Sequence, residues 1–155
     1  MSYAPSAPTI RERILQNLEA TLRAINGAPT YRHHVRKVYR FFGNAFQIGG
    51  GLPAIVIVPD VQRNTDQRSF LIEHTLPIRL LLVVESQSWR TELEALLADC
   101  RVSLLADWTR GGIALTTRIL GEEVFDSEPS APAGGAQMDL EVLFRTLYQD
   151  PGAAF

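Results

Sequence analysis

The residues that could do chemistry are few and scattered along the chain. Three histidines, His33, His34 and His74, and one cysteine, Cys100, are the candidate nitrogen and sulfur ligands for a metal such as zinc. Adjacent strand residues point to opposite faces, so His33 and His34 cannot bind one ion together, and we expect polar surface histidines. The sequence contains neither a phosphate-binding Gly-Lys-Ser/Thr loop nor a nucleophile elbow. It therefore predicts no enzyme, no metal and no cofactor.

Carboxylates leave one catalytic alternative open. Asp60 and Glu122, with other acids, could hold magnesium in a small metal-dependent nucleic-acid-processing enzyme. Many metal nucleases place a lysine shortly after such acids, whereas the sole lysine here, Lys37, precedes them. This alternative is less favoured than a structural role.

The best functional candidate is a set of arginines. A period of two over residues 31–42 places Arg32, Arg36 and Arg40 on one face of a predicted strand. The plainer interpretation pairs them with Asp139 and Glu141 of the last strand, across strands or between subunits, at ~0–1 kcal/mol each. The sharper interpretation places the arginines on the wall of a ring, near phosphates that pass through it.

Charge is unevenly distributed although the net charge is only −2. Residues 1–40 hold seven basic and two acidic residues, whereas the rest holds 8 basic and 15 acidic ones, which gives +5 and −7. This asymmetry favours self-association or an oriented partner surface over bulk nucleic-acid binding. The longest apolar run, residues 80–84, is far too short to span a bilayer, and we expect no membrane contact.

Hydrophobic periodicity predicts two amphipathic helices among strands. The first helix begins with a capping box from Thr9 to Glu12, and Ser88 caps the second, whose apolar face extends to Trp108. Strands are expected over 31–42, 53–58, 69–85, 113–125 and 138–148, with a polar hairpin tip over 59–68 and loops over 43–51 and 126–136.

These elements predict an α+β fold in the order α-β-β-β-α-β-β. We expect a mixed, mainly antiparallel sheet of about five strands with both helices packed on one face. A flexible arm over residues 1–8 would precede a single domain over 9–151, and residues 152–155 would form a tail. Loops with apolar residues at their tips suit docking. We therefore expect contacts with other copies of the chain, or with a tube-shaped partner, from the following side chains: Phe46, Ile48, Arg63, Asp66, Arg68 and Phe70.

Several stretches taken together resemble a phage tail terminator, the ring protein that closes the head-proximal end of a siphophage-type tail tube. The stretches are residues 11–22, 35–40 (Val-Arg-Lys-Val-Tyr-Arg), 53–59 (Pro-Ala-Ile-Val-Ile-Val-Pro), 76–84, 92–97 and the closing 148–151. The resemblance covers about residues 9–151 and rests on the order of the predicted elements and on their general pattern of residue types.

The resemblance implies a structural virion protein with no catalytic residues. Its subunits would form a homo-oligomer, a hexameric ring, that contacts the major tail tube protein on one side and a head-closure or neck protein on the other. Genomic DNA would pass transiently through the lumen. The protein would be found in the virion tail or neck, and in the host cytoplasm during assembly. A neck or head–tail connector protein is the nearest alternative.

Overall fold

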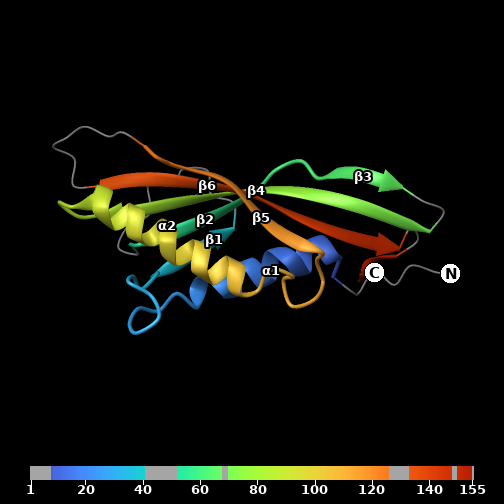
Figure 1. The fold of residues 1–155 in the computed structure, drawn as a ribbon, viewed down its shortest axis with the longest axis horizontal. Helices are drawn as coiled ribbons and strands as arrows, with labels where there is room; N and C mark the ends of the chain where they lie inside the picture. Colours follow the sequence, from blue (N-terminus) through green and yellow to red (C-terminus); the bar gives the residue numbers. More distant parts are fainter. Residues whose placement is uncertain (1–7, 41–51, 68–69, 126–132, 148–149, 155) are drawn as a thin grey trace.

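The computed structural model describes residues 8–40, 52–67, 70–125, 133–147 and 150–154. These residues form two layers, a long twisted sheet and two helices that both lie beneath the same face of it (Figure 1). Two helices and a mixed, mostly antiparallel sheet confirm the predicted α+β class. The sheet has seven strands, two more than the sequence suggested.

The sheet is built around two long central strands. Its main order is β1-β2-β4-β6-β5; β3 pairs with β4 and β7 pairs with β6. The β1–β2 pair is parallel and all other pairs are antiparallel. The strands are β1 (Lys37–Arg40), β2 (Ala54–Pro59), β3 (Arg63–Gln67), β4 (Leu71–Glu85), β5 (Thr116–Val124), β6 (Ala133–Leu147) and β7 (Asp150–Ala154).

Helix α1 (Ile10–Arg23) begins where the capping box predicted. The Thr9 hydroxyl accepts the Glu12 backbone N–H at 3.1 Å, which satisfies one free donor of the first turn. The capping box also predicts that the Glu12 carboxylate accepts the backbone N–H of Thr9. This prediction is wrong, because the carboxylate turns towards β1. A buried stripe at three- and four-residue spacing packs α1 against the sheet: Ile10, Ile14, Leu15, Leu18 and Leu22.

Helix α2 (Trp89–Ala106) covers the other half of the same face. Its Leu93, Leu97, Cys100 and Leu104 are buried in the core, as predicted. Ser88 occupies the N-cap position without a side-chain hydrogen bond to the helix, so the expected cap is wrong. The helix also ends earlier than its apolar pattern suggested, which leaves Trp108 beyond it.

Alternation along the central strands decides which side chains meet the helices. The even-numbered residues of β4 and β6 from 76 to 84 and from 136 to 144 are buried against α1 and α2. The odd-numbered residues point to the face that carries no helix, called the helix-free face below. The predicted alternation of the last strand, with Met138 and Phe144 inside and Asp139 outside, is confirmed.

The strand expected over residues 31–42 is mostly wrong. Only residues 37–40 of it form a strand, and residues 41–42 lie outside the described residues. Upstream, the Val35 N–H donates to Ile25 O, and the buried Asp99 of α2 accepts the N–H groups of Arg32 and His33. These contacts hold the segment against the helix layer, so its period-two pattern does not extend the sheet.

Three other boundaries differ from the sequence prediction. The polar stretch expected as a hairpin tip contains β3, which pairs with β4 through a bulge. Residues 133–136, expected as loop, begin β6, where small residues such as Gly134 fit beneath the Trp89 ring. Residues 152–154, expected as a tail, belong to β7.

Candidate functional site

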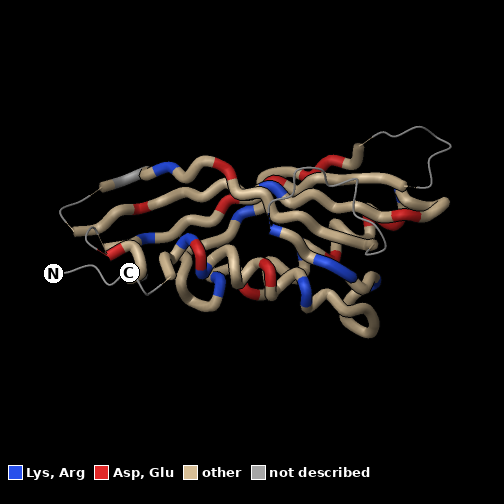
Figure 2. The backbone as a smooth tube through the Cα atoms, turned by 180° about the vertical axis from the view of Figure 1, so that it is seen from behind, with Lys and Arg blue, Asp and Glu red and all other residues tan. Residues whose placement is uncertain are grey.

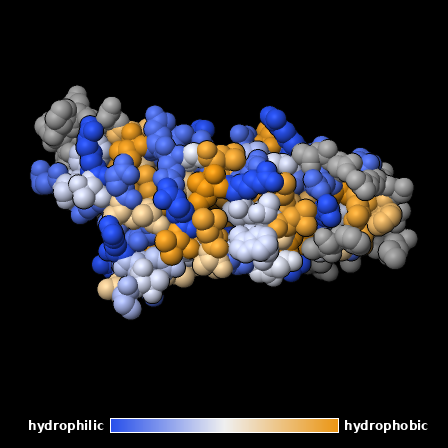
Figure 3. Space-filling view, viewed as in Figure 1, coloured by the Kyte–Doolittle hydropathy of each residue, from blue (hydrophilic) through white to orange (hydrophobic). Residues whose placement is uncertain are grey.

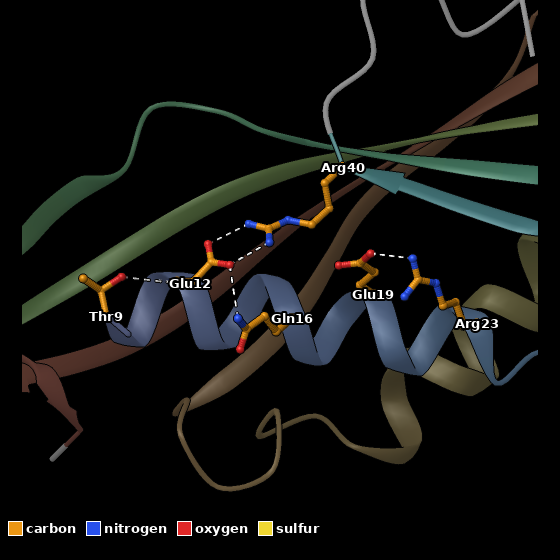
Figure 4. A network of polar contacts seen from close by, with 6 residues as sticks. All are labelled: Thr9, Glu12, Gln16, Glu19, Arg23 and Arg40. Carbon is orange, nitrogen blue, oxygen red and sulfur yellow. Dashed lines mark hydrogen bonds and ion pairs between the residues drawn. The ribbon is translucent and has the colours of Figure 1, made fainter. Parts of the chain in front are cut away.

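Arg40, one of the three candidate arginines, is engaged within the chain. Its Nη1 lies 2.7 Å from Glu12 Oε1 and its Nη2 lies 2.7 Å from Glu12 Oε2, so the pair has two contact points (Figure 4). The Arg40 hydrogen bonds are the main reason that the pKa of Glu12 is below its ordinary value, and burial acts in the opposite direction. Arg40 therefore ties β1 to α1 on the helix-covered face.

The two candidate acids pair with other arginines. Arg79 Nε lies 2.9 Å from Asp139 Oδ1, and Arg118 Nη1 lies 3.6 Å from Glu141 Oε1, both across neighbouring strands of the helix-free face. The expected pairing with the β1 arginines inside one chain is wrong, because β2 and β4 separate β1 from β6. Inter-subunit pairing stays a prediction.

Of the remaining basic residues, Arg36 and Lys37 lie at the β1 edge of the sheet, whereas Arg32 lies beside α2. Arg32, Arg36 and Lys37 are exposed, and none of the three forms an ion pair with another described residue. Figure 2, which views the molecule from behind, shows blue Lys and Arg positions along this side. The β1 edge therefore presents uncompensated positive charge, while the predicted single column of arginines does not form.

The helix-free face is apolar over one half and charged over the other. Ala54, Val56 and Val83 are buried there, and Tyr39 and Leu81 pack against them. The sequence predicted this, since β2 and the inner part of β4 are apolar on both faces. The charged half holds the cross-strand pairs of β4, β6 and β5, among them Arg145 with Glu73 at 3.1 Å.

Exposed apolar side chains collect where α2 runs beside the edge strand β5. They are Leu105, Trp108 and Leu120, of which Trp108 is 53% and Leu120 59% exposed. Hydrophobic surface is visible across this side of the molecule in Figure 3. A shallow groove of about 680 Å³ lies between the two elements, and the ion pair of Arg101 with Glu122 crosses it. This combination suits contact with another macromolecule.

His74 forms the most concentrated polar cluster of the described residues. Its ring is 7% exposed and stacks on Phe144 with the centroids 4.7 Å apart. Gln62 Nε2 and Asn64 Oδ1 lie 2.9 and 2.8 Å from Nδ1, and Thr146 Oγ1 lies 2.8 Å from Nε2. Burial lowers the pKa of His74, which favours the neutral ring.

The expectation of surface histidines is wrong for His74. The sequence could have indicated its burial, because His74 continues the every-second-residue pattern of Leu76, Ile78 and Leu80 on β4. Among the described residues, the hydrogen-bond partners of the His74 ring are two amides and a hydroxyl, so no acid orients the ring as in a catalytic triad. A cavity of about 240 Å³ beside it is mostly apolar in lining and reaches Arg11. We interpret the cluster as a structural feature that closes this end of the core, with both ring nitrogens of His74 in hydrogen bonds.

Asp99 is the second residue that sequence reasoning missed. It is buried on α2, and its carboxylate accepts the backbone N–H groups of Arg32 at 3.1 Å and His33 at 2.9 Å. The signal was an acid beside Cys100 within the apolar face of a helix. Asp99 fixes the segment that leads into β1, so it positions the basic edge.

The six residues expected to make docking contacts are only partly described. Phe46, Ile48 and Arg68 lie outside the described residues. Arg63 and Phe70 are exposed at the two ends of the β3–β4 hairpin, and Asp66 lies in β3 opposite Glu73. Their expected role in oligomer or tube contacts stays a prediction.

Three acids of the enzyme alternative, Asp139, Asp60 and Glu123, lie around Arg79, where the hydrogen bond to Asp139 is the main reason that the pKa of Arg79 is above its ordinary value. Among the described residues, no group of three or more His, Cys, Asp and Glu side chains is placed to hold a metal ion. Glu122 pairs with Arg101, and the Asp60 carboxylate accepts the N–H of Val61.

Comparison with known proteins adds no relative: no family model matches the chain, and no curated protein matches its sequence. No helix within the described parts of the chain is both long enough and apolar enough to cross a membrane.

Proposed function

We propose that the chain is a structural virion protein of the phage tail terminator kind. It acts by forming a ring of about six copies that caps the head-proximal end of a tail tube and joins it to the head or neck. The mechanism is assembly by surface contact, without bond-making chemistry.

The observation that carries the proposal is the pair of unlike ends of the sheet. One end, at β1, is basic through Arg36 and Lys37. The other end, at β5, lies beside exposed apolar side chains and carries the exposed Glu123, while Glu122 is paired with Arg101 of α2. Two different, complementary surfaces on one chain favour head-to-tail contacts, which close into a ring when the rotation permits.

The other partners follow from the same proposal. The ring would contact the major tail tube protein on one side and a head-closure protein on the other, and genomic DNA would pass through its lumen. Arg32 and Arg36 are exposed without an ion pair to another described residue, so they are available to phosphates or to acids of a neighbouring copy. A place in the neck instead of on the tube is the nearest alternative.

Electron microscopy of the purified chain tests the proposal. We expect rings with a central opening, and we expect Leu105→Asp to abolish them because it puts a charge into the exposed apolar surface of α2. Thr91→Asp is the matched control, since it adds the same charge at an exposed position at the other end of α2. Rings in both variants, or in neither wild type nor variants, would contradict the proposal.

A parallel assay addresses the enzyme alternative. Magnesium-dependent cleavage of DNA or RNA that is lost in both Asp60→Asn and Glu122→Gln would favour it over the ring. The ring proposal predicts no cleavage by wild type and rings from Asp60→Asn.

A further inference from the structure

A cavity of about 240 Å³ lies at the end of the sheet where α1 begins, close to β7 (Figure 1). Its lining comes from the start of α1, from the segment before β3, and from β4, β6 and β7. The deepest side chains, His74, Phe144 and Thr146, are buried, whereas Arg11 is partly exposed and Pro151 is exposed. The cavity therefore has a buried floor and a rim that a ligand can reach from solvent.

The floor presents mainly apolar surface. The His74 ring stacks on Phe144, and its two nitrogens lie 2.9 Å from Gln62 Nε2 and 2.8 Å from Thr146 Oγ1. Because both ring nitrogens have partners, the ring contributes surface to the cavity and no free hydrogen-bonding group. Further apolar side chains of the lining are Ile72, Leu147 and Pro151. The lower part of the cavity therefore suits an apolar group of a ligand.

Arg11 supplies positive charge at the rim. Its Nη1 lies 3.5 Å from Gln62 Oε1, which is a long contact, and it forms no ion pair with another described residue. Arg23 and Arg40, by contrast, pair with Glu19 and Glu12. The described residues that line the cavity include no Asp or Glu. The guanidinium, whose planar fork of N–H donors matches a carboxylate, is thus available to an anion that enters the cavity.

We propose that this cavity binds a small carboxylate, with its apolar group over His74 and Phe144 and its carboxylate at Arg11. The volume limits the size of the ligand, because a water molecule takes about 30 Å³ of liquid and 240 Å³ therefore holds roughly eight non-hydrogen atoms. The ligand class is an aromatic or branched aliphatic monocarboxylate, either as a free acid or as the carboxyl-terminal residue of a peptide. This site goes beyond the ring-forming function and does not depend on it.

Benzoate and benzamide are the probes, because they have nearly the same shape and differ in charge. Isothermal titration calorimetry of the full chain at pH 7 measures both. We expect benzoate to bind with a dissociation constant on the order of 1 mM, an ordinary value for so small a ligand. Benzamide should bind about ten-fold more weakly, since hydrogen bonds to a charged partner are the stronger kind.

Three variants locate the site. Arg11→Gln should weaken benzoate binding about ten-fold and leave benzamide binding unchanged. Arg13→Gln is the matched control, because Arg13 is an exposed arginine of α1 outside the lining, and it should leave both affinities unchanged. Ile72→Phe places a larger side chain in the cavity and should abolish the binding of both ligands, with circular dichroism to check that the chain is folded.

Nuclear magnetic resonance of the labelled chain adds the position. Benzoate should shift the backbone amide signals of Ile72 and Thr146, and shifts confined to other parts of the chain would overturn the site. Equal affinity for benzoate and benzamide, an Arg11→Gln variant that binds benzoate like wild type, or no binding of benzoate at all would also overturn it.

The dipeptide glycyl-phenylalanine and its carboxamide separate the two sources of the carboxylate. Tighter binding of the free dipeptide than of benzoate assigns the site to chain ends, and the reverse order assigns it to free acids. In either case the carboxamide should bind more weakly than the free dipeptide, and equal affinity of the two would contradict the role of Arg11. Ring formation is measured separately, so failure of this site leaves the ring proposal untouched.

Discussion

Replacing Asp99 should detach the segment that leads into β1. The carboxylate accepts the Arg32 N–H at 3.1 Å and the His33 N–H at 2.9 Å, and the side chain is buried. Hydrogen bonds to a charged group contribute about 1.5–3 kcal/mol each, and a buried donor left unpaired costs about as much. Alanine forms helix better than aspartate by about 0.5 kcal/mol. For Asp99→Ala the two hydrogen bonds together, less the gain in helix propensity, give an expected loss of about 2.5–5.5 kcal/mol in the free energy of unfolding.

Asp99→Asn separates the hydrogen bonds from the charge. One amide oxygen can still accept an N–H, so we expect about half of the alanine loss. Urea unfolding monitored by circular dichroism measures both variants, and amide hydrogen exchange at Arg32 and His33 reports whether the loss is local. Glu94→Ala is the control, since it removes an exposed acid from the same helix. If Asp99→Ala proves as stable as Glu94→Ala, the reasoning about this anchor is wrong.

Three further outcomes test the packing and the electrostatics. Gly134→Ala should lower the free energy of unfolding by about 2–3 kcal/mol in thermal unfolding, because a Cβ there would lie 2.2 Å from Trp89 Cε3. Gly121 has open space around it, so Gly121→Ala should change the free energy by no more than about 0.5 kcal/mol. Equal effects of the two variants would contradict the packing. Glu12 has a lowered pKa in the folded chain, so its ion pair stabilises above the ordinary value of 4.5 and is lost as pH falls below it. The difference in stability between wild type and Glu12→Gln should be about 1 kcal/mol at pH 7 and should shrink as pH falls below 4.5, and a constant difference would refute this. The pKa of His74 is also lowered by burial, so wild type should lose stability as pH falls from about 7 through the ordinary value of 6.5, and unchanged pH dependence in His74→Gln would exclude this ring as the cause.

The periodic parts of the chain were predictable from the sequence. The α1 stripe, the alternation of β6 and the two-sided apolar pattern of β2 each gave the correct element and the correct buried face. In these segments the hydrophobic pattern and the tertiary packing require the same residues to be inside. The fold class follows directly, because two apolar helix stripes need the sheet face as their partner.

The failures come from contacts between residues far apart in sequence. Residues 31–36 alternate like a strand, but Asp99, more than sixty positions later, takes their backbone donors. Arg40 looked free for an external role until Glu12 was found beside it. β3 and β7 lack strong apolar patterns and form because each finds a long strand whose backbone it can pair with.

The candidate site was only partly foreseeable for the same reason. Sequence asymmetry indicated a basic and an acidic surface, but not that Tyr39 and Glu123 would lie at the same level on opposite ends of the sheet. Such a relation depends on the register of four strand pairs, which no local pattern encodes. Exposure of Trp108 was likewise hidden, because it continues the apolar face of α2 but falls after the helix ends.

The mass of the purified chain in solution, measured by sedimentation over a range of concentrations, tests the assembly account most directly. The account predicts a discrete species of about six times the 17.2 kDa of one chain. A single species at 17.2 kDa at every concentration would contradict it.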